Sequence, residues 1–212
     1  MLEEKGYPFK SKEHSLRVEQ FNKGTNAKFI HKYTRQTDYD GKYVCPKILM
    51  YQFEEKGKYN YSNKCCYELK KKPFHKWQKE NNKQIAITGM RAEEGGNRER
   101  LGCIITDKNK VVKFHPLIKV DDEFEDWFIE KFNIQLCKLY YPPFNFNRTG
   151  CKGCPYALDL QSQLEIMERL LPNERRQCEI IWKPVYEEYR RLGYRLKSKE
   201  QKTEVLCFKR TS

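Results

Sequence analysis

Two pairs of cysteines constrain this chain more than any other feature of its sequence. Cys65 and Cys66 are adjacent, 84 residues lie between Cys66 and Cys151, and Cys151 and Cys154 end a Cys-Lys-Gly-Cys segment. Two thiolates separated by two residues can bind one metal centre from a tight loop, and the glycine between them lets the backbone fold around the sulfurs. We therefore expect the fold to bring the two pairs together.

The spacing also bears on which metal the cysteines would hold. Four thiolates suit either a structural zinc ion or an iron–sulfur cluster. Zinc ligands are normally a few residues apart, whereas adjacent cysteines more readily place both sulfurs on a larger object such as a cubane cluster. The pattern favours a 4Fe-4S cluster with zinc as the alternative, and the predicted metal ligands are Cys65, Cys66, Cys151 and Cys154.

The other cysteines are predicted to be thiols rather than disulfide partners. The chain carries nine cysteines, an odd number. In a reducing compartment, cysteines are more often metal ligands, redox groups or buried thiols than disulfide partners. Cys45, Cys103, Cys137 and Cys178 have apolar neighbours, so we expect them to be buried. Cys45, before Pro46, is a reserve metal ligand.

Charge and hydropathy narrow the class of protein. Among its 212 residues the chain has 42 Lys and Arg against 29 Asp and Glu, a net charge of +13. This excess predicts a polyanionic partner such as a nucleotide or nucleic acid. No apolar run has the length of a membrane span, and the first residues contain no apolar segment of the kind found in a secretory signal. We expect a cytoplasmic protein without a membrane partner.

Periodicity and turn residues predict alternating strands and helices. Residues 84–88 are a short β-branched run that we interpret as a buried strand, and residues 102–106 and 111–115 are two further strands joined by hairpin-turn chemistry. Helices are predicted at 11–21, from 62 to before Pro73, at 121–132, at 158–171 and at 173–192, with Gly193 after the last.

A polar loop after the first predicted strand supplies candidate anion-binding residues. Arg91 and Arg98 lie on this loop, and ligands of open α/β sheets bind at the carboxyl ends of strands. Guanidinium groups suit phosphate or sulfate oxygens. We therefore predict that Arg91 and Arg98 bind the anionic end of a nucleotide, with Lys12 and Arg17 as weaker candidates. The alternative for Arg91 is an ion pair with a glutamate of the same loop.

These features together resemble one family, the phosphoadenylylsulfate (PAPS) and adenylylsulfate (APS) reductases. The two cysteine pairs resemble the 4Fe-4S pattern of its APS reductases. The resemblance continues between the pairs, in Ile87-Thr88-Gly89-Met90-Arg91 with Glu94 and Arg98, in Lys113-Phe114-His115-Pro116-Leu117, and in Asp121 to Trp127. It implies an adenine nucleotide alpha-hydrolase-like (PP-loop) fold, an adenine nucleotide or sulfonucleotide as ligand, and sulfonucleotide reduction or sulfur transfer as activity.

Two family features are missing from this sequence. The family's phosphate-cradling Ser-Gly-Gly-Lys-Asp-Ser loop does not occur, and Cys207 lacks the glycine and histidine context of the family's C-terminal catalytic cysteine. We therefore expect a natural truncation, a fragment of a longer product, or one half of a split protein whose N-terminal half a partner subunit supplies. In each case the chain would be incomplete as an isolated enzyme. No catalytic residue is assigned.

The overall prediction is an α/β fold with a small mixed sheet flanked by helices. We expect a partial reductase-like domain at 1–157, a helical appendage at 158–196 and a loosely ordered tail at 197–212. The alternative function is a metal-stabilised basic binding module for nucleic acid or a partner subunit. Its phosphate contacts would come from Lys70–Lys72 and from the arginines of the last helices.

Overall fold

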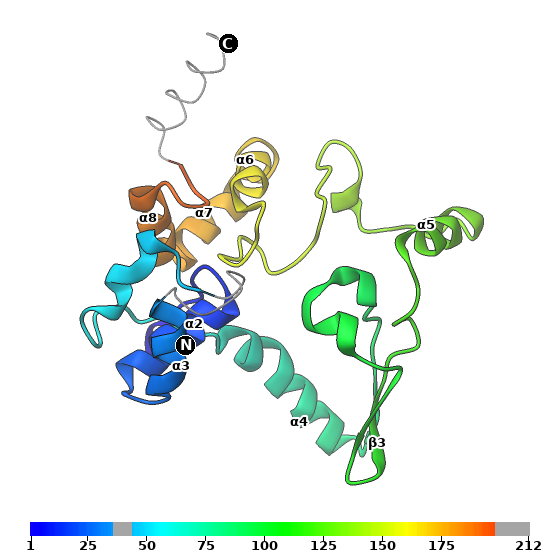
Figure 1. The fold of residues 1–212 in the computed structure, drawn as a ribbon. Coiled ribbons are helices and arrows are strands. Elements are labelled where there is room, and N and C mark those ends of the chain that lie inside the picture. The colour runs from blue at the N-terminus through cyan, green and yellow to red at the C-terminus, as the bar shows by residue number, and fades with distance from the viewer. Residues whose placement is uncertain (36–43, 198–212) are drawn as a thin grey trace. The chain divides into compact units, whose positions relative to one another are not determined.

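The computed structural model describes residues 1–35 and 44–197, and the chain divides into two compact units (Figure 1). The helical unit comprises Met1–Leu69 and Leu139–Ser212, and the sheet unit comprises Lys70–Lys138. The predicted α/β class with a small mixed sheet is confirmed. The predicted tail, from residue 198 onward, lies outside the described residues.

The helical unit is built from both ends of the chain. Its elements are α1 (Leu2–Lys5), α2 (Lys12–Asn22), α3 (Ala27–Arg35), the 3-10 helix η1 (Lys47–Phe53), α6 (Leu160–Leu170), α7 (Pro172–Ile181) and α8 (Lys183–Leu192). The helix predicted at 11–21 is confirmed as α2, because the Ser11 side chain accepts a hydrogen bond from the backbone N–H of His14 at 3.1 Å and caps its start.

One hydrophobic core holds this unit together. Its buried members come from the first third of the chain and from the last helices, and include Phe9, Val18, Leu49, Leu160, Leu164, Val185, Tyr186 and Tyr189. The helices predicted as an appendage at 158–196 thus share a core with residues 1–69, and the compact units follow different boundaries from those expected. The physical reason is that an amphipathic helix must bury its apolar face, and the N-terminal segments supply the opposing surface.

The last predicted helix is in fact two helices. The break falls at Trp182, between α7 and α8, because Pro184 stands in the first turn of α8, where its missing N–H costs no hydrogen bond. The predicted end is confirmed: Gly193 follows α8 with φ +62°, the left-handed conformation that glycine adopts without strain.

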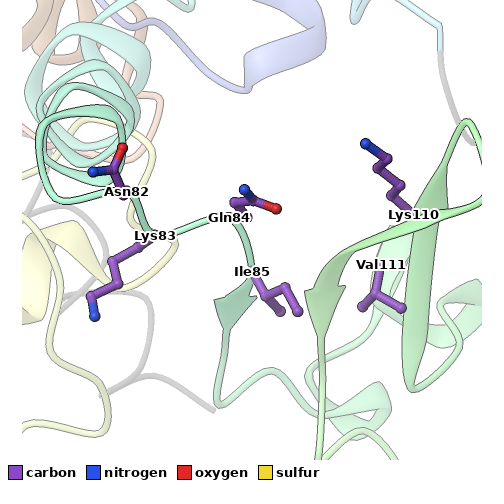
Figure 2. Close-up of a pocket in the computed structure, with 6 residues that line it drawn as sticks. All are labelled: Asn82, Lys83, Gln84, Ile85, Lys110 and Val111. Atoms are coloured by element: carbon purple, nitrogen blue, oxygen red, sulfur yellow. The ribbon is translucent and has the colours of Figure 1, made fainter.

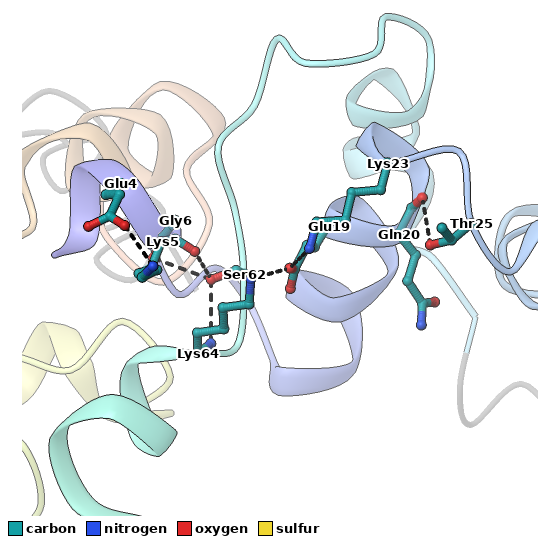
Figure 3. A network of polar contacts seen from close by, with 9 residues as sticks. All are labelled: Glu4, Lys5, Gly6, Glu19, Gln20, Lys23, Thr25, Ser62 and Lys64. Atoms are coloured by element: carbon teal, nitrogen blue, oxygen red, sulfur yellow. Dashed lines mark hydrogen bonds and ion pairs between the residues drawn. The ribbon is translucent and has the colours of Figure 1, made fainter. Parts of the chain in front are cut away.

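Polar contacts fix the segment that leads into the first cysteine pair (Figure 3). The Ser62 hydroxyl donates to the carbonyl oxygen of Lys5 at 2.5 Å, and Lys64 Nζ lies 2.7 Å from Glu19 Oε1 of α2. The N-terminus and α2 therefore position the residues immediately before Cys65.

The helix after this pair continues past the proline that was expected to end it. A π-helical turn, η2 (Tyr67–Lys71), runs into α4 (Lys72–Glu80), and Pro73 stands in the first turn of α4. The prediction of an end before Pro73 is wrong, because the wide π turn relieves the usual clash between a proline ring and the carbonyl four residues earlier.

The sheet unit contains a three-stranded mixed sheet. Strands β1 (Ala86–Ile87), β2 (Ile104–Asp107) and β3 (Lys110–Phe114) have the order β1-β3-β2. Ala86 pairs with Lys113 in a parallel register, and β2 pairs antiparallel with β3. The predicted hairpin is confirmed: its turn residues Lys108 and Asn109 have φ values of +47° and +61°, as a tight hairpin turn requires.

The strand predicted as buried is short and mostly exposed. Ala86 is buried, but Ile87 is 71% exposed. Within the described side chains of the sheet unit, burial is limited to Ala86, His115 and Ile118. Among the described residues, too few side chains of this unit are buried to form a second layer over the strand, so its β-branched residues are not all buried.

The rest of the sheet unit is helical. It contains the 3-10 helices η3 (Ala92–Glu94) and η4 (Gly96–Arg100) and the helix α5 (Asp122–Lys131), and η5 (Lys138–Tyr140) stands at the boundary between the units. The helix predicted at 121–132 is confirmed as α5, whose start is capped by the Asp121 carboxylate accepting from the Phe124 N–H at 2.8 Å. Across the described parts of the chain, no helix combines the length and the apolar character needed to cross a membrane.

Candidate metal centre and nucleotide loop

All four predicted metal ligands lie in the helical unit. Cys65 is buried, whereas Cys66, Cys151 and Cys154 are half-buried. The first pair opens the helical turn before η2, and the second pair lies on the loop before α6. None of the cysteines within residues 1–35 and 44–197 forms a disulfide.

Electrostatic interaction links three of these thiols. Burial raises the pKa of Cys65, and the neighbouring Cys66 and Cys154 raise it further. Tyr156 lies among the same groups: burial raises the pKa of its hydroxyl, and so do Cys65, Cys66 and Cys154, against a lowering hydrogen bond with Ser15. Cys154 of the second segment is therefore near enough to Cys65 to act on its charge, and the joint binding of one metal by both pairs stays a prediction.

Tyr156 joins the cysteine loop to the rest of the unit. Its hydroxyl lies 3.1 Å from Ser15 Oγ of α2 and 3.3 Å from the carbonyl oxygen of Ser62. Ser15 in turn accepts from the Phe9 N–H at 2.9 Å. These bonds connect the residue after the second cysteine pair to the segment before the first pair.

The Cys-Lys-Gly-Cys segment is a tight turn that requires its glycine. The Cys154 N–H donates to the Cys151 carbonyl at 3.0 Å, and Gly153 has φ +58°. A Cβ atom at position 153 would lie 2.6 Å from both Cys178 Sγ and Tyr186 Oη. Glycine is therefore needed both for backbone conformation and for the close approach of α7 and α8.

The chemistry of these residues fits a thiolate-ligated metal. In the described ranges, no three or more His, Cys, Asp or Glu side chains are arranged as a formed metal-binding group. The donors nevertheless match what iron–sulfur clusters and zinc bind: four cysteines of one unit, outside any disulfide, of which Cys66 and Cys154 both raise the pKa of Cys65. The metal itself stays a prediction.

The remaining cysteines divide between the two units. Cys45 and Cys178, in the helical unit, are buried as expected. Cys103 and Cys137, in the sheet unit, are exposed, so the prediction that they are buried is wrong. The same lack of a covering layer that exposes Ile87 explains this difference.

The loop predicted to bind an anion leaves the carboxyl end of β1 in the sheet unit. The Arg91 guanidinium contacts Asp122 Oδ1 at 2.6 Å and Glu125 Oε2 at 2.5 Å, both on α5, and its side chain is 15% exposed. Arg98 is 37% exposed and lies 3.4 Å from Glu94. Arg91 is thus ion-paired, but with α5 rather than with a glutamate of its own loop.

The neighbouring strand end is fixed by a buried histidine. His115 Nδ1 lies 2.6 Å from Thr88 Oγ1, and the Thr88 N–H donates to the Phe114 carbonyl at 3.0 Å. The Ala92 N–H donates to the Ile118 carbonyl at 3.0 Å. The residues that follow β1 and β3 therefore form one supported edge, from which the loop carrying Arg91 projects.

The weaker candidates for the same anion lie in the other unit. Lys12 and Arg17 are on α2; Lys12 is exposed, and Arg17 pairs with Glu13 at 2.5 Å while its guanidinium lies 5.1 Å from the centre of the Phe29 ring. The four predicted cations are therefore divided between the helical unit and the sheet unit.

An open pocket lies at the opposite end of the parallel strands (Figure 2). Its volume is about 570 Å³, and it is lined by Asn82, Lys83, Gln84, Ile85, Lys110 and Val111. Ile85 precedes β1 and Lys110 begins β3, so this pocket is at the amino ends of the strands and is separate from the loop carrying Arg91.

Three arginines of the last helices form ion pairs within the helical unit. Arg175 and Arg190 both pair with Glu179, and Arg191 pairs with Glu188. A phosphate backbone would have to compete with these carboxylates for the three arginines. Arg176 and Lys70–Lys72 are exposed, and the nucleic-acid alternative stays a prediction.

Comparison with family models identifies the class of protein. The model of the phosphoadenosine phosphosulfate reductase domain matches residues 13–157, about two thirds of the chain. The chain belongs to this family, and the predicted resemblance is confirmed. A sulfonucleotide-related function follows at the level of the family. Comparisons with curated proteins and with solved structures each gave no significant match.

Several residues that shape these sites were not found from the sequence. The ion pair of Arg91 with Asp122 and Glu125 had only a weak signal, the acidic first turn of α5. The contact of Tyr156 with the cysteines had none. Both interactions join residues that are far apart in the sequence. The spacing of residues within one segment does not predict such pairs.

Proposed function

We propose that this chain holds a 4Fe-4S cluster on Cys65, Cys66, Cys151 and Cys154 and serves in sulfonucleotide reduction or in sulfur transfer on an adenine nucleotide. The observation that carries the proposal is the convergence of two distant cysteine segments within one unit of a chain that belongs to the reductase family. When bound, such a cluster would supply thiolate-ligated iron and its concentrated charge.

The chain's own residues have distinct parts in holding this centre. The segment before Cys65 is fixed by Ser62 and Lys64, and the second pair is fixed by the turn at Gly153. Tyr156 bonds to both α2 and the carbonyl of Ser62, and so keeps the two cysteine segments next to each other. Holding thiols in place before a metal arrives lowers the entropy that binding must overcome.

The anionic end of the nucleotide is assigned to the loop that leaves β1. Arg98 is the better candidate for direct contact, because its side chain is more exposed than that of Arg91. Arg91, with two carboxylates on its guanidinium, would shape the loop and present its backbone. Lys12 and Arg17, on α2 of the helical unit, stay predictions from the sequence.

Metal analysis of anaerobically purified protein tests the first part. We expect about four irons and four sulfides per chain, with both lost in Cys154→Ser and retained in the control Cys103→Ser. Stoichiometric zinc without sulfide would contradict the cluster and establish a zinc site instead. Absence of both metals from protein reconstituted with iron and sulfide would overturn the proposed centre.

Nucleotide binding tests the second part. Arg98→Ala should weaken binding of PAPS about tenfold, the loss of one charge-assisted hydrogen bond, whereas Arg100→Ala on the same loop should have little effect. Isothermal titration calorimetry at fixed salt measures both variants. Equal affinities for the two variants and the unaltered chain would exclude Arg98 from the site. Salt-sensitive DNA or RNA binding in place of nucleotide binding would favour the basic binding module.

A further inference from the structure

The second cysteine segment is held by side chains from the last helices of the chain. The carbonyl oxygen of Lys152 accepts a hydrogen bond from Trp182 Nε1 at 3.1 Å, and the carbonyl oxygen of Gly153 accepts one from the Tyr186 hydroxyl at 2.5 Å. The two residues between Cys151 and Cys154 are thus each bound through their backbone.

The residue after the second cysteine is held in the same way. The carbonyl oxygen of Pro155 accepts from the Tyr189 hydroxyl at 2.9 Å and from Arg195 Nη1 at 2.6 Å. The side chain of Lys152 binds Glu174 and Gln177 of α7. Every residue from 152 to 155 other than the cysteine therefore contacts α7, α8 or the turn that follows.

The tyrosines that make these bonds are deeply buried. Tyr186 and Tyr189 have no exposed surface, and they lie three residues apart on one face of α8. Hydrogen bonds in such an interior are strong, and a carbonyl left without its donor there is costly. The close packing of Gly153 against Cys178 and Tyr186 adds a steric limit to the same turn.

We propose that α7 and α8 act as a clamp on the Cys151–Pro155 loop, in which Tyr186 and Tyr189 are positioning residues for Cys151 and Cys154. The carbonyls of Lys152, Gly153 and Pro155 are bonded to α8 and to the residues that flank it, so the backbone that carries Cys151 and Cys154 is fixed from one side. The role of the clamp in metal binding rests on the proposed function, whereas the hydrogen bonds of the clamp form in the chain without metal.

The test compares the full chain carrying Tyr186→Phe and Tyr189→Phe with a matched control, Tyr194→Phe. Tyr194 packs against the Tyr189 ring, with centroids 5.6 Å apart, and no hydrogen bond of its hydroxyl is found in the described part of the chain. The first readout is the rate at which iodoacetamide alkylates Cys151 and Cys154 in reduced, metal-free protein, measured by mass spectrometry relative to the exposed Cys103. We expect about a tenfold rise in the double variant and none in the control, in line with the usual effect of residues that orient metal ligands.

The second readout is the rate at which reconstituted protein loses its iron–sulfur absorbance to a chelator, which should also rise about tenfold in the double variant only. Unchanged rates in both measurements would overturn the clamp. Faster alkylation in a chain that takes up no metal would sustain the clamp and refute the proposed function. If the double variant loses its helical circular dichroism, the single variant Tyr186→Phe, which removes only the hydroxyl that bonds the Gly153 carbonyl, is measured in the same two ways.

Discussion

The helical unit buries far more of its apolar side chains than the sheet unit does. In the helical unit, side chains from residues 9–61 and 146–196 form one continuous buried core. In the sheet unit, the described side chains that are buried are Ala86, His115 and Ile118. Large apolar residues stay exposed there, among them Ile85, Ile87, Ile104, Phe124, Trp127 and Phe132.

The difference shows that apolar residues form a core only where a second group of side chains packs against them. Helices α6 and α8 find their opposing surface in the N-terminal segments, whereas the two-residue strand β1 has only β3 beside it. The four predicted metal ligands lie in the unit with the larger buried core, and the loop of Arg91 lies in the sheet unit, where it forms ion pairs with α5. Regions with few buried apolar contacts open at lower free energy.

The largest expected effect comes from comparing one aliphatic truncation in each unit. Leu160→Ala, at a fully buried site, should lower the free energy of unfolding of the helical unit by about 4 kcal/mol, because it removes buried methyl groups and leaves a cavity. Ile87→Ala, 71% exposed, should change stability by less than about 0.5 kcal/mol. Hydrogen exchange resolved by peptide reports each unit separately, and equal effects would mean that the sheet unit buries β1 after all.

The next largest expected effect is a loss of stability of the helical unit at acidic pH. His14 is fully buried between Tyr33 and Gln52, and burial lowers its pKa from 6.5 to about 4, although the bond to Gln52 opposes this. Between these values the unfolded chain binds a proton that the folded chain does not, so stability is lost as pH falls from 6.5 towards 4. The loss should reach about 3 kcal/mol and be confined to the helical unit.

Urea unfolding at a series of pH values measures this slope. His14→Asn, which cannot titrate in this range, serves as the comparison. The variant should start from lower stability and show a flatter pH dependence. An equal slope in both proteins would assign the acid sensitivity to other groups.

The smallest effect concerns the turn that packs against the helical core. Gly153→Ala meets both a positive φ and the close contact with Cys178 and Tyr186, and should cost about 2 kcal/mol or more. Gly57→Ala, at φ +82° with no atom within 4 Å of the added Cβ, meets the backbone cost alone and should cost about 1 kcal/mol. Thermal unfolding measures the stability that each variant loses, and the difference between the two variants gives the cost of the close contact at position 153. Equal losses of stability would show that this turn is not tightly packed.

Local signals were read correctly where they act within one segment. The helices predicted at 11–21 and 121–132 form, Gly193 follows the last helix as predicted, and the hairpin turn forms at Lys108 and Asn109. Predictions failed where a distant segment decides the outcome. Ile87 and Cys103 are exposed because few side chains of the described sheet unit pack over the sheet. The helix through Pro73 is a local failure instead, since the π turn that accommodates the proline immediately precedes it.

The sequence by itself determined the α/β class, the family and the expectation that the two cysteine pairs would meet, because spacing, caps and turns are properties of neighbouring residues. Only the tertiary structure decided that the last helices share a core with the first residues, that Arg91 is paired with α5, and that Tyr186 and Tyr189 bond the cysteine loop. The physical reason is that burial and hydrogen bonding between distant segments depend on which surfaces meet, and no short-range pattern encodes that choice.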